Sequence, residues 1–225
     1  MSSIILVRHG KSLWNKENRF TGWTDISLSN DGINEAELAA QEILEKKLII
    51  HKAYSSIFRR AYNTGEIILK NSKNKLTNIV QDWRLNERHY GNLQGLNKSE
   101  TSKKYGDDKV LEWRRSFKTK PPLLDQKTYD IQITNPLFKQ IPKESIPYGE
   151  SLEDTVKRVK MFCNEILYKK LEEKNNILIA AHGNSLRALI KIIENKSEKE
   201  TEKLEIQTGK PIFYTYKEKI FTKVN

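Results

Sequence analysis

Two stretches of the chain are continuously apolar: residues 4–7 (IILV) and residues 178–181 (LIAA), the latter within the segment 176–184 (NILIAAHGN). Uninterrupted apolar runs of this length are typical of strands that are buried on both faces, as in a parallel sheet. Residues 53–56 (AYSS) and 78–83 (NIVQDW) are weaker strand candidates. The pattern therefore predicts four strands, spread along most of the chain.

Apolar residues at helical spacing lie between and after these strands. Ser29 is suited to cap a helix, and residues 57–69 and 185–194 indicate two further helices. Ser151 and Asp154 have the spacing of a capping box, which predicts the start of a long helix. The apolar positions expected on the buried faces of the helices after Ser29 and Ser151 are Ile33, Ala36, Ala40, Ile43, Leu44, Leu152, Val156, Val159, Cys163, Ile166 and Leu167.

The alternation of strands and helices predicts an α/β fold with a mostly parallel central sheet and helices on both faces. A length of 225 residues fits a single domain, residues 1–225, with a sizeable core. Residues 86–148 interrupt the alternation, and five of the six prolines lie between residues 121 and 147. We expect little regular structure there but, because aromatic and aliphatic residues are present, an ordered lid.

The charge of the chain favours anionic ligands. Lysine and arginine number 40 against 29 aspartate and glutamate, so the formal net charge is +11. The lysines are interleaved with glutamate, as in KSEKETEKLE, which argues against a nucleic-acid-binding module. No apolar stretch is long enough to span a membrane, and no basic signal-peptide segment precedes residues 4–7. The single cysteine, Cys163, has apolar neighbours and is expected in the core, so we predict a reducing, cytoplasmic setting.

Each continuously apolar stretch is followed closely by a histidine and a glycine: His9 with Gly10, and His182 with Gly183. Carboxyl ends of parallel strands line the ligand crevice of an open α/β sheet, so the two histidines meet there if their strands are neighbours. The glycines would let backbone amides approach an anion closely. Unrelated loop histidines are the alternative, but the repeated context favours one shared site. No spacing of histidine, cysteine or carboxylate indicates a metal site.

Arginines near the predicted strand ends add capacity for binding anions. Arg8 adjoins His9, and Arg60 lies near the start of the helix that follows the second strand. Guanidinium groups bind phosphate or carboxylate oxygens in a bidentate way. Of an adjacent pair on a helix, such as Arg114 and Arg115, only one residue points inward easily. We therefore expect some of these arginines at the site and others on the surface.

Glu87 is the acidic residue best placed to act as a general acid and base. It lies in the polar segment LNERHYGNLQGLNKSE, residues 85–100, among cationic side chains and glycines. A reaction that moves a proton on and off a substrate hydroxyl needs such a group within hydrogen-bond reach. An ordinary ion pair in a loop is the alternative.

Five segments, in order along the chain, resemble the signature motifs of the cofactor-dependent phosphoglycerate mutases, a branch of the histidine phosphatase superfamily. They are LVRHGKSLWNKENRFTGW, LNERHYGNLQGLNKSE, EWRRSF, GESL and AAHGNSLRALIK. The resemblance covers nearly the whole chain and is weakest after Leu204. We therefore expect a mobile C-terminal tail over about residues 205–225.

The resemblance implies an enzyme that interconverts 3-phosphoglycerate and 2-phosphoglycerate. His9 would carry a phosphoryl group on Nε2, primed by 2,3-bisphosphoglycerate and without a metal; a neutral imidazole is a competent nucleophile near pH 7. Arg8, Arg60 and His182 would supply positive charge around the phosphoryl oxygens. Glu87 would donate and accept the proton. The positions implied to bind substrate are Arg8, His9, Gly10, Lys11, Ser12, Asn15, Thr21, Gly22, Arg60, Glu87, Arg88, His89, Tyr90, Lys98, Arg114, Arg115, Gly183 and Asn184.

The same resemblance implies small phosphorylated three-carbon acids as partners, no nucleic acid or membrane, and a homo-oligomer, either a dimer or a tetramer. Two positions depart from the family pattern: Lys11 stands where Glu or Gln is usual, and Thr24 where Tyr is frequent. Neither removes a group that the mechanism requires. A bisphosphoglycerate synthase and a broad phosphatase of the same superfamily are the alternatives. Ser12 is typical of the mutase rather than the synthase, and a lid that carries Lys98 and excludes water favours the mutase over the phosphatase.

Overall fold

The sheet at the centre of the protein is mixed rather than mostly parallel. The computed structural model describes residues 1–75 and 78–224, and within them the strands pair in the order β3-β2-β4-β1-β5-β6. The first four of this order run parallel, whereas β5 and β6 are antiparallel to their neighbours. The strands are β1 (Ser2–Arg8), β2 (Lys52–Ser55), β3 (Val80–Gln81), β4 (Ile177–Ala181), β5 (Pro211–Lys217) and β6 (Ile220–Val224).

The two antiparallel strands come from the C-terminal segment that the sequence predicts to be mobile. That prediction is wrong up to Val224; residue 225 lies outside the described residues. Glu218 and Lys219, between β5 and β6, have positive φ angles of 51° and 64°, as in a two-residue hairpin turn. The hairpin is held because β5 pairs with β1 and buries Phe213 and Tyr214. The C-terminal segment therefore completes the sheet.

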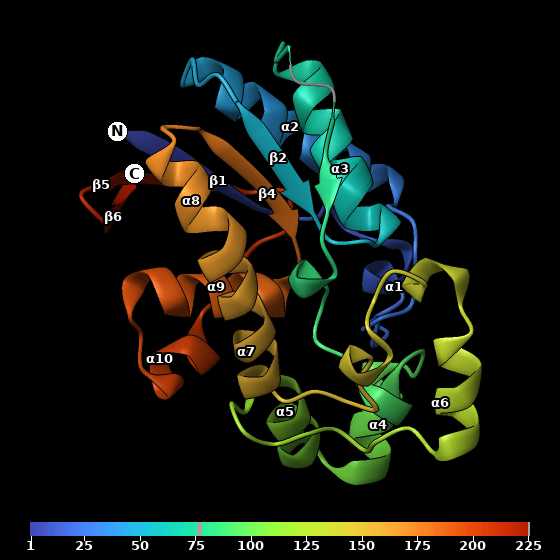
Figure 1. The fold of residues 1–225 in the computed structure, drawn as a ribbon. Helices are drawn as coiled ribbons and strands as arrows, with labels where there is room; N and C mark the ends of the chain where they lie inside the picture. The colour runs from blue at the N-terminus through green and yellow to red at the C-terminus, as the bar shows by residue number, and fades with distance from the viewer. Residues whose placement is uncertain (76–77, 225) are drawn as a thin grey trace.

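Helices cover both faces of the sheet, as predicted (Figure 1). Ser29 caps α2, and Ser151 forms a capping box with Asp154 at α7. None of the helices in the described ranges is both long and apolar enough to cross a membrane. The helices are α1 (Leu13–Lys16), α2 (Asn30–Glu45), α3 (Arg59–Asn71), α4 (Lys98–Tyr105), α5 (Asp107–Arg115), α6 (Gln126–Ile133), α7 (Leu152–Phe162), α8 (Tyr168–Glu172), α9 (Gly183–Glu194) and α10 (Glu198–Lys203).

The core is divided by the sheet into two clusters, because consecutive side chains of a strand point to opposite faces. Ile4 and Leu6 of β1 pack in one cluster with α7, α8 and α9. Ile5 and Val7 pack in the other cluster with α2 and α3. All four side chains have no exposed area. This anchoring holds the end of β1, and the residues that follow it, in a fixed position.

The helices that begin after Ser29 and Ser151 differ in detail from the apolar pattern predicted for them. In α2, Ile33 and Leu44 are 39% exposed, and the buried face is made largely of alanines, which lets the helix lie close to the sheet. Between α7 and α8 the helix continues through a π-helical turn, Cys163–Leu167. Cys163 is buried and free, as predicted.

Residues 86–148 lie beyond the carboxyl ends of the parallel strands and contain α4, α5 and α6 (Figure 1). The proline-rich part is more regular than predicted, since α6 forms between the flanking prolines and is capped by Asp125. Its apolar residues form a cluster in which Tyr129 and Phe138 pack with Trp23 and Phe58 from the rest of the protein. The insertion is therefore packed against the body of the fold by a small core of its own.

Candidate functional site

The two histidines predicted to meet lie side by side. β1 and β4 are neighbouring parallel strands in which Arg8 is aligned with Ala181, so His9 and His182 both follow the carboxyl ends of the strands. Their ring centroids are 4.9 Å apart, and the planes are inclined by 64°. Both side chains are buried. The juxtaposition that the sequence predicts is confirmed.

The protein fixes the tautomer of His9. Its Nδ1 lies 2.7 Å from the carbonyl oxygen of Gly10, which only accepts, so Nδ1 carries the proton and Nε2 keeps a free lone pair. Burial, together with the nearby charges of Arg60 and Arg8, lowers the pKa of His9 well below its usual value of 6.5. His9 is therefore a neutral imidazole at pH 7, with Nε2 available as a nucleophile.

His182 is supported from the side of β2. Its Nε2 lies 2.7 Å from Oγ of Ser56, and the backbone N–H of Phe58 donates to the same hydroxyl. Burial lowers its pKa well below 6.5, and the charge of Arg60 adds to this effect. The ring packs against His9 rather than lining the cavity described next. His182 thus lies behind His9 as part of the wall that orients it.

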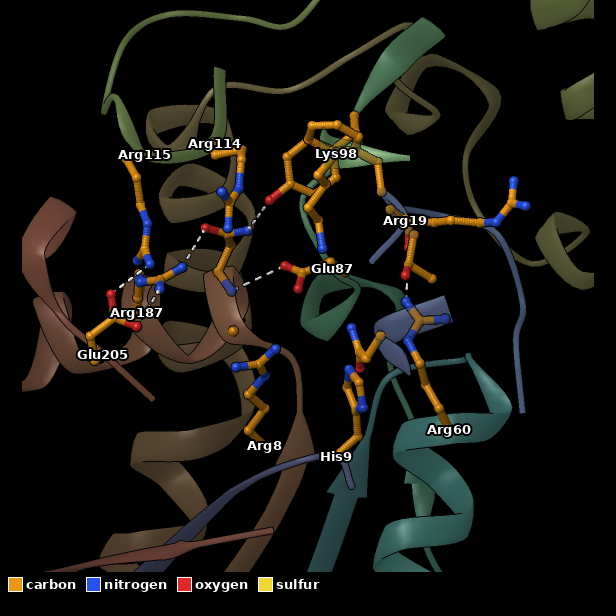
Figure 2. A pocket seen from close by; sticks show the side chains of 17 residues that line it. Arg8, His9, Arg19, Arg60, Glu87, Lys98, Arg114, Arg115, Arg187 and Glu205 are labelled. Carbon is orange, nitrogen blue, oxygen red and sulfur yellow. Dashed lines mark hydrogen bonds and ion pairs between the residues drawn. The ribbon is translucent and has the colours of Figure 1, made fainter. Parts of the chain in front are cut away.

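A cavity of about 240 Å³ opens at this edge of the sheet (Figure 2). It is bounded by the carboxyl end of β1, the first turns of α9, the start of α3, residues 15–22 and the insertion. Thirteen of the residues predicted to form the site line it: Arg8, His9, Asn15, Thr21, Gly22, Arg60, Glu87, Tyr90, Lys98, Arg114, Arg115, Gly183 and Asn184.

Arg8 and Arg60 present unsatisfied donors at the cavity. Arg60 is fully buried, and its two terminal nitrogens donate to the carbonyls of Thr24 (2.7 Å) and Gly22 (2.8 Å). Nε of Arg60 and Nε of Arg8 are buried without a hydrogen-bond partner among the described residues. Burial lowers the pKa of Arg60 to about 10, which still leaves it cationic at pH 7. Buried donors of this kind cost free energy unless they receive an acceptor, which an anion would supply.

Glu87 is held at the start of α9. Its Oε1 accepts hydrogen bonds from the backbone N–H of Asn184 (3.0 Å) and of Arg88 (2.9 Å). The side-chain amide of Asn184 donates in turn to the hydroxyl of Tyr90 at 3.1 Å. Only one carboxylate oxygen is engaged in this way, so the other faces the cavity as a proton acceptor.

Arg114 and Arg115 both line the cavity, although only one of them was expected to point inward. They lie in the last turn of α5, where the helix stops at Ser116 and the two side chains reach the same space. Lys98, at the start of α4, is also there, and burial with the neighbouring charges of Arg114 and Arg8 lowers its pKa to about 8. Lys98 therefore loses its positive charge as pH rises through about 8.

Five residues that the resemblance implies to bind substrate do not line the cavity. A Cβ on Gly10 would lie 2.0 Å from the carbonyl oxygen of Gly32, so this glycine permits close packing of the loop against α2 rather than approach to an anion. Arg88 donates to the carbonyls of Glu150 and Thr119 and ties the insertion to the fold. The residues outside the lining are Gly10, Lys11, Ser12, Arg88 and His89.

Four residues that line the cavity were missed by sequence reasoning: Arg19, Phe20, Arg187 and Glu205. Arg187 lies four positions after Gly183 on α9, and helical spacing from the AAHGNSLR motif could have placed it on the same face. Glu205 carries no comparable signal, because it lies in an irregular segment between α10 and β5.

Among the described residues, no group of three or more His, Cys, Asp or Glu side chains is arranged to hold a metal ion. The absence of a metal from the reaction stays a prediction.

His89 makes stability depend on pH. Burial lowers its pKa to about 4, so between that value and the unfolded value of 6.5 the unfolded chain binds more protons. The free energy of unfolding is therefore expected to fall as pH drops from 7 to 4, by about 3 kcal/mol from this residue. Urea denaturation across this range measures the slope. His89→Gln should make the slope shallower without removing it, because the pKa values of His9 and His182 are also lowered by burial. The exposed His51→Gln should not make it shallower; equal slopes in all three proteins would contradict the expectation.

A family model described as "Histidine phosphatase superfamily (branch 1)" matches residues 4–133 and 126–224. Curated relatives named 2,3-bisphosphoglycerate-dependent phosphoglycerate mutase are similar over most of the chain. The Borreliella afzelii protein is 48% identical over 214 residues, which cover 95% of this chain and 86% of the relative. The Parabacteroides distasonis protein is 44% identical, covering 96% and 87%. The Staphylococcus epidermidis protein is 42% identical, covering 95% and 94%.

Solved structures share the fold. A mycobacterial glucosyl-3-phosphoglycerate phosphatase in complex with VO3 superposes with a TM-score of 0.75 at 21% identity, covering 99% of this chain and 97% of that one. A phosphoglycerate mutase from Bacillus anthracis gives 0.71 at 22% identity, covering 99% and 91%. At these identities the likeness concerns the α/β architecture and its mixed sheet alone.

Proposed function

This chain belongs to the 2,3-bisphosphoglycerate-dependent phosphoglycerate mutases of the histidine phosphatase superfamily, and we propose that its cavity interconverts 3-phosphoglycerate and 2-phosphoglycerate through a phosphorylated His9. The observation that carries the proposal is a buried, neutral His9 with a free Nε2 in a cavity rich in cations. The cationic side chains that line it are Arg8, Arg19, Arg60, Lys98, Arg114, Arg115 and Arg187.

The cavity suits a primer with two phosphate groups. Side-chain atoms that are buried without a partner among the described residues occur on several residues of its lining: Nε of Arg8, Nε of Arg60, Oγ1 of Thr21 and Nη1 of Arg115. When bound, 2,3-bisphosphoglycerate supplies the phosphoryl group that primes His9. Arg8 and Arg60 would hold that phosphate, and Arg114 and Arg115 the distal anionic group.

His9 is the nucleophile in this proposal. Because Nδ1 is tied to the carbonyl of Gly10, Nε2 forms the bond to phosphorus, and the positive charge that develops on the ring is shared along the Nδ1–H hydrogen bond. Arg8 and Arg60 stabilise the negative charge on the equatorial oxygens during transfer. His182 packs against the ring of His9 and limits its reorientation.

Glu87 moves the proton. As the substrate hydroxyl attacks the phosphoryl group on His9, it must lose its proton, and in the second transfer the released hydroxyl must regain one. The carboxylate is fixed by two backbone N–H groups, so its free oxygen accepts and returns the proton without changing position. Glu87 belongs to the insertion and His9 follows β1, so the base and the nucleophile lie on different walls of the cavity.

The insertion, residues 86–148, is proposed to act as a lid within a single domain. It contributes Glu87, Tyr90, Lys98, Arg114 and Arg115 to the cavity, so substrate binding and water exclusion would depend on the same segment. Exclusion of water is what separates a mutase from a phosphatase with the same histidines. A cytoplasmic location and a homo-oligomeric state belong to the same proposal.

The test is an assay of all three activities on the purified chain: mutase, bisphosphoglycerate synthase and phosphatase. We expect conversion of 3-phosphoglycerate to 2-phosphoglycerate to rise about 10-fold or more when 2,3-bisphosphoglycerate is added, because only the phosphorylated enzyme is competent. Mutase turnover should exceed the other two activities by about 10-fold or more, because the proposed lid excludes water from the phosphorylated enzyme. Phosphate release as the dominant activity would contradict the proposal.

A further inference from the structure

Glu205 places a carboxylate of the protein where a ligand anion is expected to bind. It lies at the end of the cavity away from Arg60, beside Arg115 and Arg187 (Figure 2). Its Oε1 is 2.5 Å from Nη2 of Arg115, and its Oε2 is 3.9 Å from Nη2 of Arg187. The side chain is 71% exposed. Contact with the two guanidinium groups, rather than burial, therefore holds the carboxylate in place.

The backbone around Glu205 is anchored by arginines of the same cavity. Nε of Arg187 donates to the carbonyl of Leu204, and Nη1 of Arg8 donates to the carbonyl of Ile206, both at 2.7 Å. The residues on either side of Glu205 are thus fixed to the walls of the site. The backbone that carries the carboxylate is therefore anchored to the cavity on both sides.

Glu205 reduces the positive charge at this end without using every donor. Nη1 of Arg115 is buried and has no partner among the described residues, so Arg115 keeps a donor for a ligand while it is paired with Glu205. Arg187 also donates to Oδ1 of Asn184 at 3.0 Å, next to Glu87. A ligand that reaches this end meets the cations of Arg114, Arg115 and Arg187 together with one fixed anion.

We propose that Glu205 is a specificity-determining residue that weakens binding of a bisphosphorylated three-carbon acid relative to a monophosphorylated one. The inference rests on the proposed function for the identity of these ligands. A fixed negative charge repels a ligand in proportion to the ligand's own charge, so the penalty is largest for the most highly charged species. Glu205 thereby counteracts the tight retention of the bisphosphorylated acid that the cationic lining alone would produce.

Binding without turnover tests the proposal. Glu205→Gln keeps the shape and the hydrogen-bond acceptor, and it is introduced into a His9→Asn background that lacks the nucleophile. Calorimetric titrations compare 2,3-bisphosphoglycerate, 3-phosphoglycerate and inorganic phosphate. We expect affinities to rise about 10-fold, about 3-fold and less than about 2-fold, respectively. The matched control is Glu198→Gln, which removes the same charge from an exposed ion pair with Lys118 outside the cavity lining and should leave all three affinities unchanged.

Steady-state kinetics of Glu205→Gln with an intact His9 provide the second readout. The KM for 3-phosphoglycerate should fall about 3-fold while kcat stays within about 2-fold of the parent. Equal gains for all three ligands would overturn the proposal, because the effect of Glu205 would then not depend on the charge of the ligand. Weaker binding of any of them would also overturn it, because Glu205 would then merely position Arg115. The titrations do not depend on turnover, so failure of the mutase assay would contradict the proposed function and leave this comparison intact.

Discussion

Replacement of His9 with alanine is expected to abolish phosphoryl transfer, lowering kcat by about 10⁴-fold or more. The reason is that Nε2 of His9 is the nucleophile of the proposed transfer, and alanine offers no group that forms a bond to phosphorus. Incubation with radioactive 2,3-bisphosphoglycerate should label the parent protein with acid-labile phosphate. The variant should remain unlabelled.

Two further variants make this result decisive. His9→Asn keeps a donor near the carbonyl of Gly10 and removes the ring, so it separates loss of the nucleophile from any loss of folding. His51→Ala removes an exposed histidine that lies at the opposite end of β2 and should retain full activity and labelling. Circular dichroism and thermal unfolding check the fold of each protein. Substantial turnover or labelling in either His9 variant would contradict the assignment.

Glu87→Gln is expected to lower kcat by about 10²- to 10⁴-fold, with KM for 3-phosphoglycerate changed by less than about 3-fold. Glutamine keeps an oxygen that accepts from the backbone N–H groups of Asn184 and Arg88, so the cavity should keep its shape. What it loses is the ability to accept and return a proton. Steady-state assays with 3-phosphoglycerate, in the presence of 2,3-bisphosphoglycerate, measure kcat and KM.

Phosphohistidine labelling distinguishes this role from a structural one. Glu87→Gln should reach the same final extent of labelling as the parent, because His9 and its arginines are unchanged. It should reach that extent more slowly, because glutamine cannot return a proton to the released hydroxyl. Glu100→Gln on the exposed side of α4 is the matched control and should behave like the parent. A Glu87→Gln enzyme with more than about a tenth of the parental kcat would rule out proton transfer by this residue.

The sequence predicts the centre of the fold and the paired histidines because those signals are local. Residues 4–7 and 178–181 are apolar without interruption, which identifies β1 and β4. Because these strands are parallel neighbours, the histidines that follow them lie side by side at their carboxyl ends. Ser29 and Ser151 likewise mark helix starts through contacts within one turn. Such patterns can be interpreted without knowledge of contacts between distant residues, and the strands and helices that they predict are present in the structure.

Features that depend on distant partners were not predictable in the same way. β5 and β6 are joined by a turn at Glu218 and Lys219 instead of at Asn-Gly, so the usual sequence signal of a hairpin is absent, and pairing of β5 with β1 decides their structure. Glu205 lies at the site only because distant arginines hold the segment around it. Gly10 was expected to approach an anion, but the contact with Gly32 that explains it spans two elements.

The position of β1 between β4 and β5 also has a consequence for how the protein is made. β1 is synthesised before both of its partners: its parallel partner β4 follows about 170 residues later, and β5 later still. Until then its apolar side chains have no permanent cover, so we expect the sheet to form only after β4 and β5 have been synthesised. Fragments released early would expose an unpaired strand, and such chains are prone to aggregate or to require chaperones.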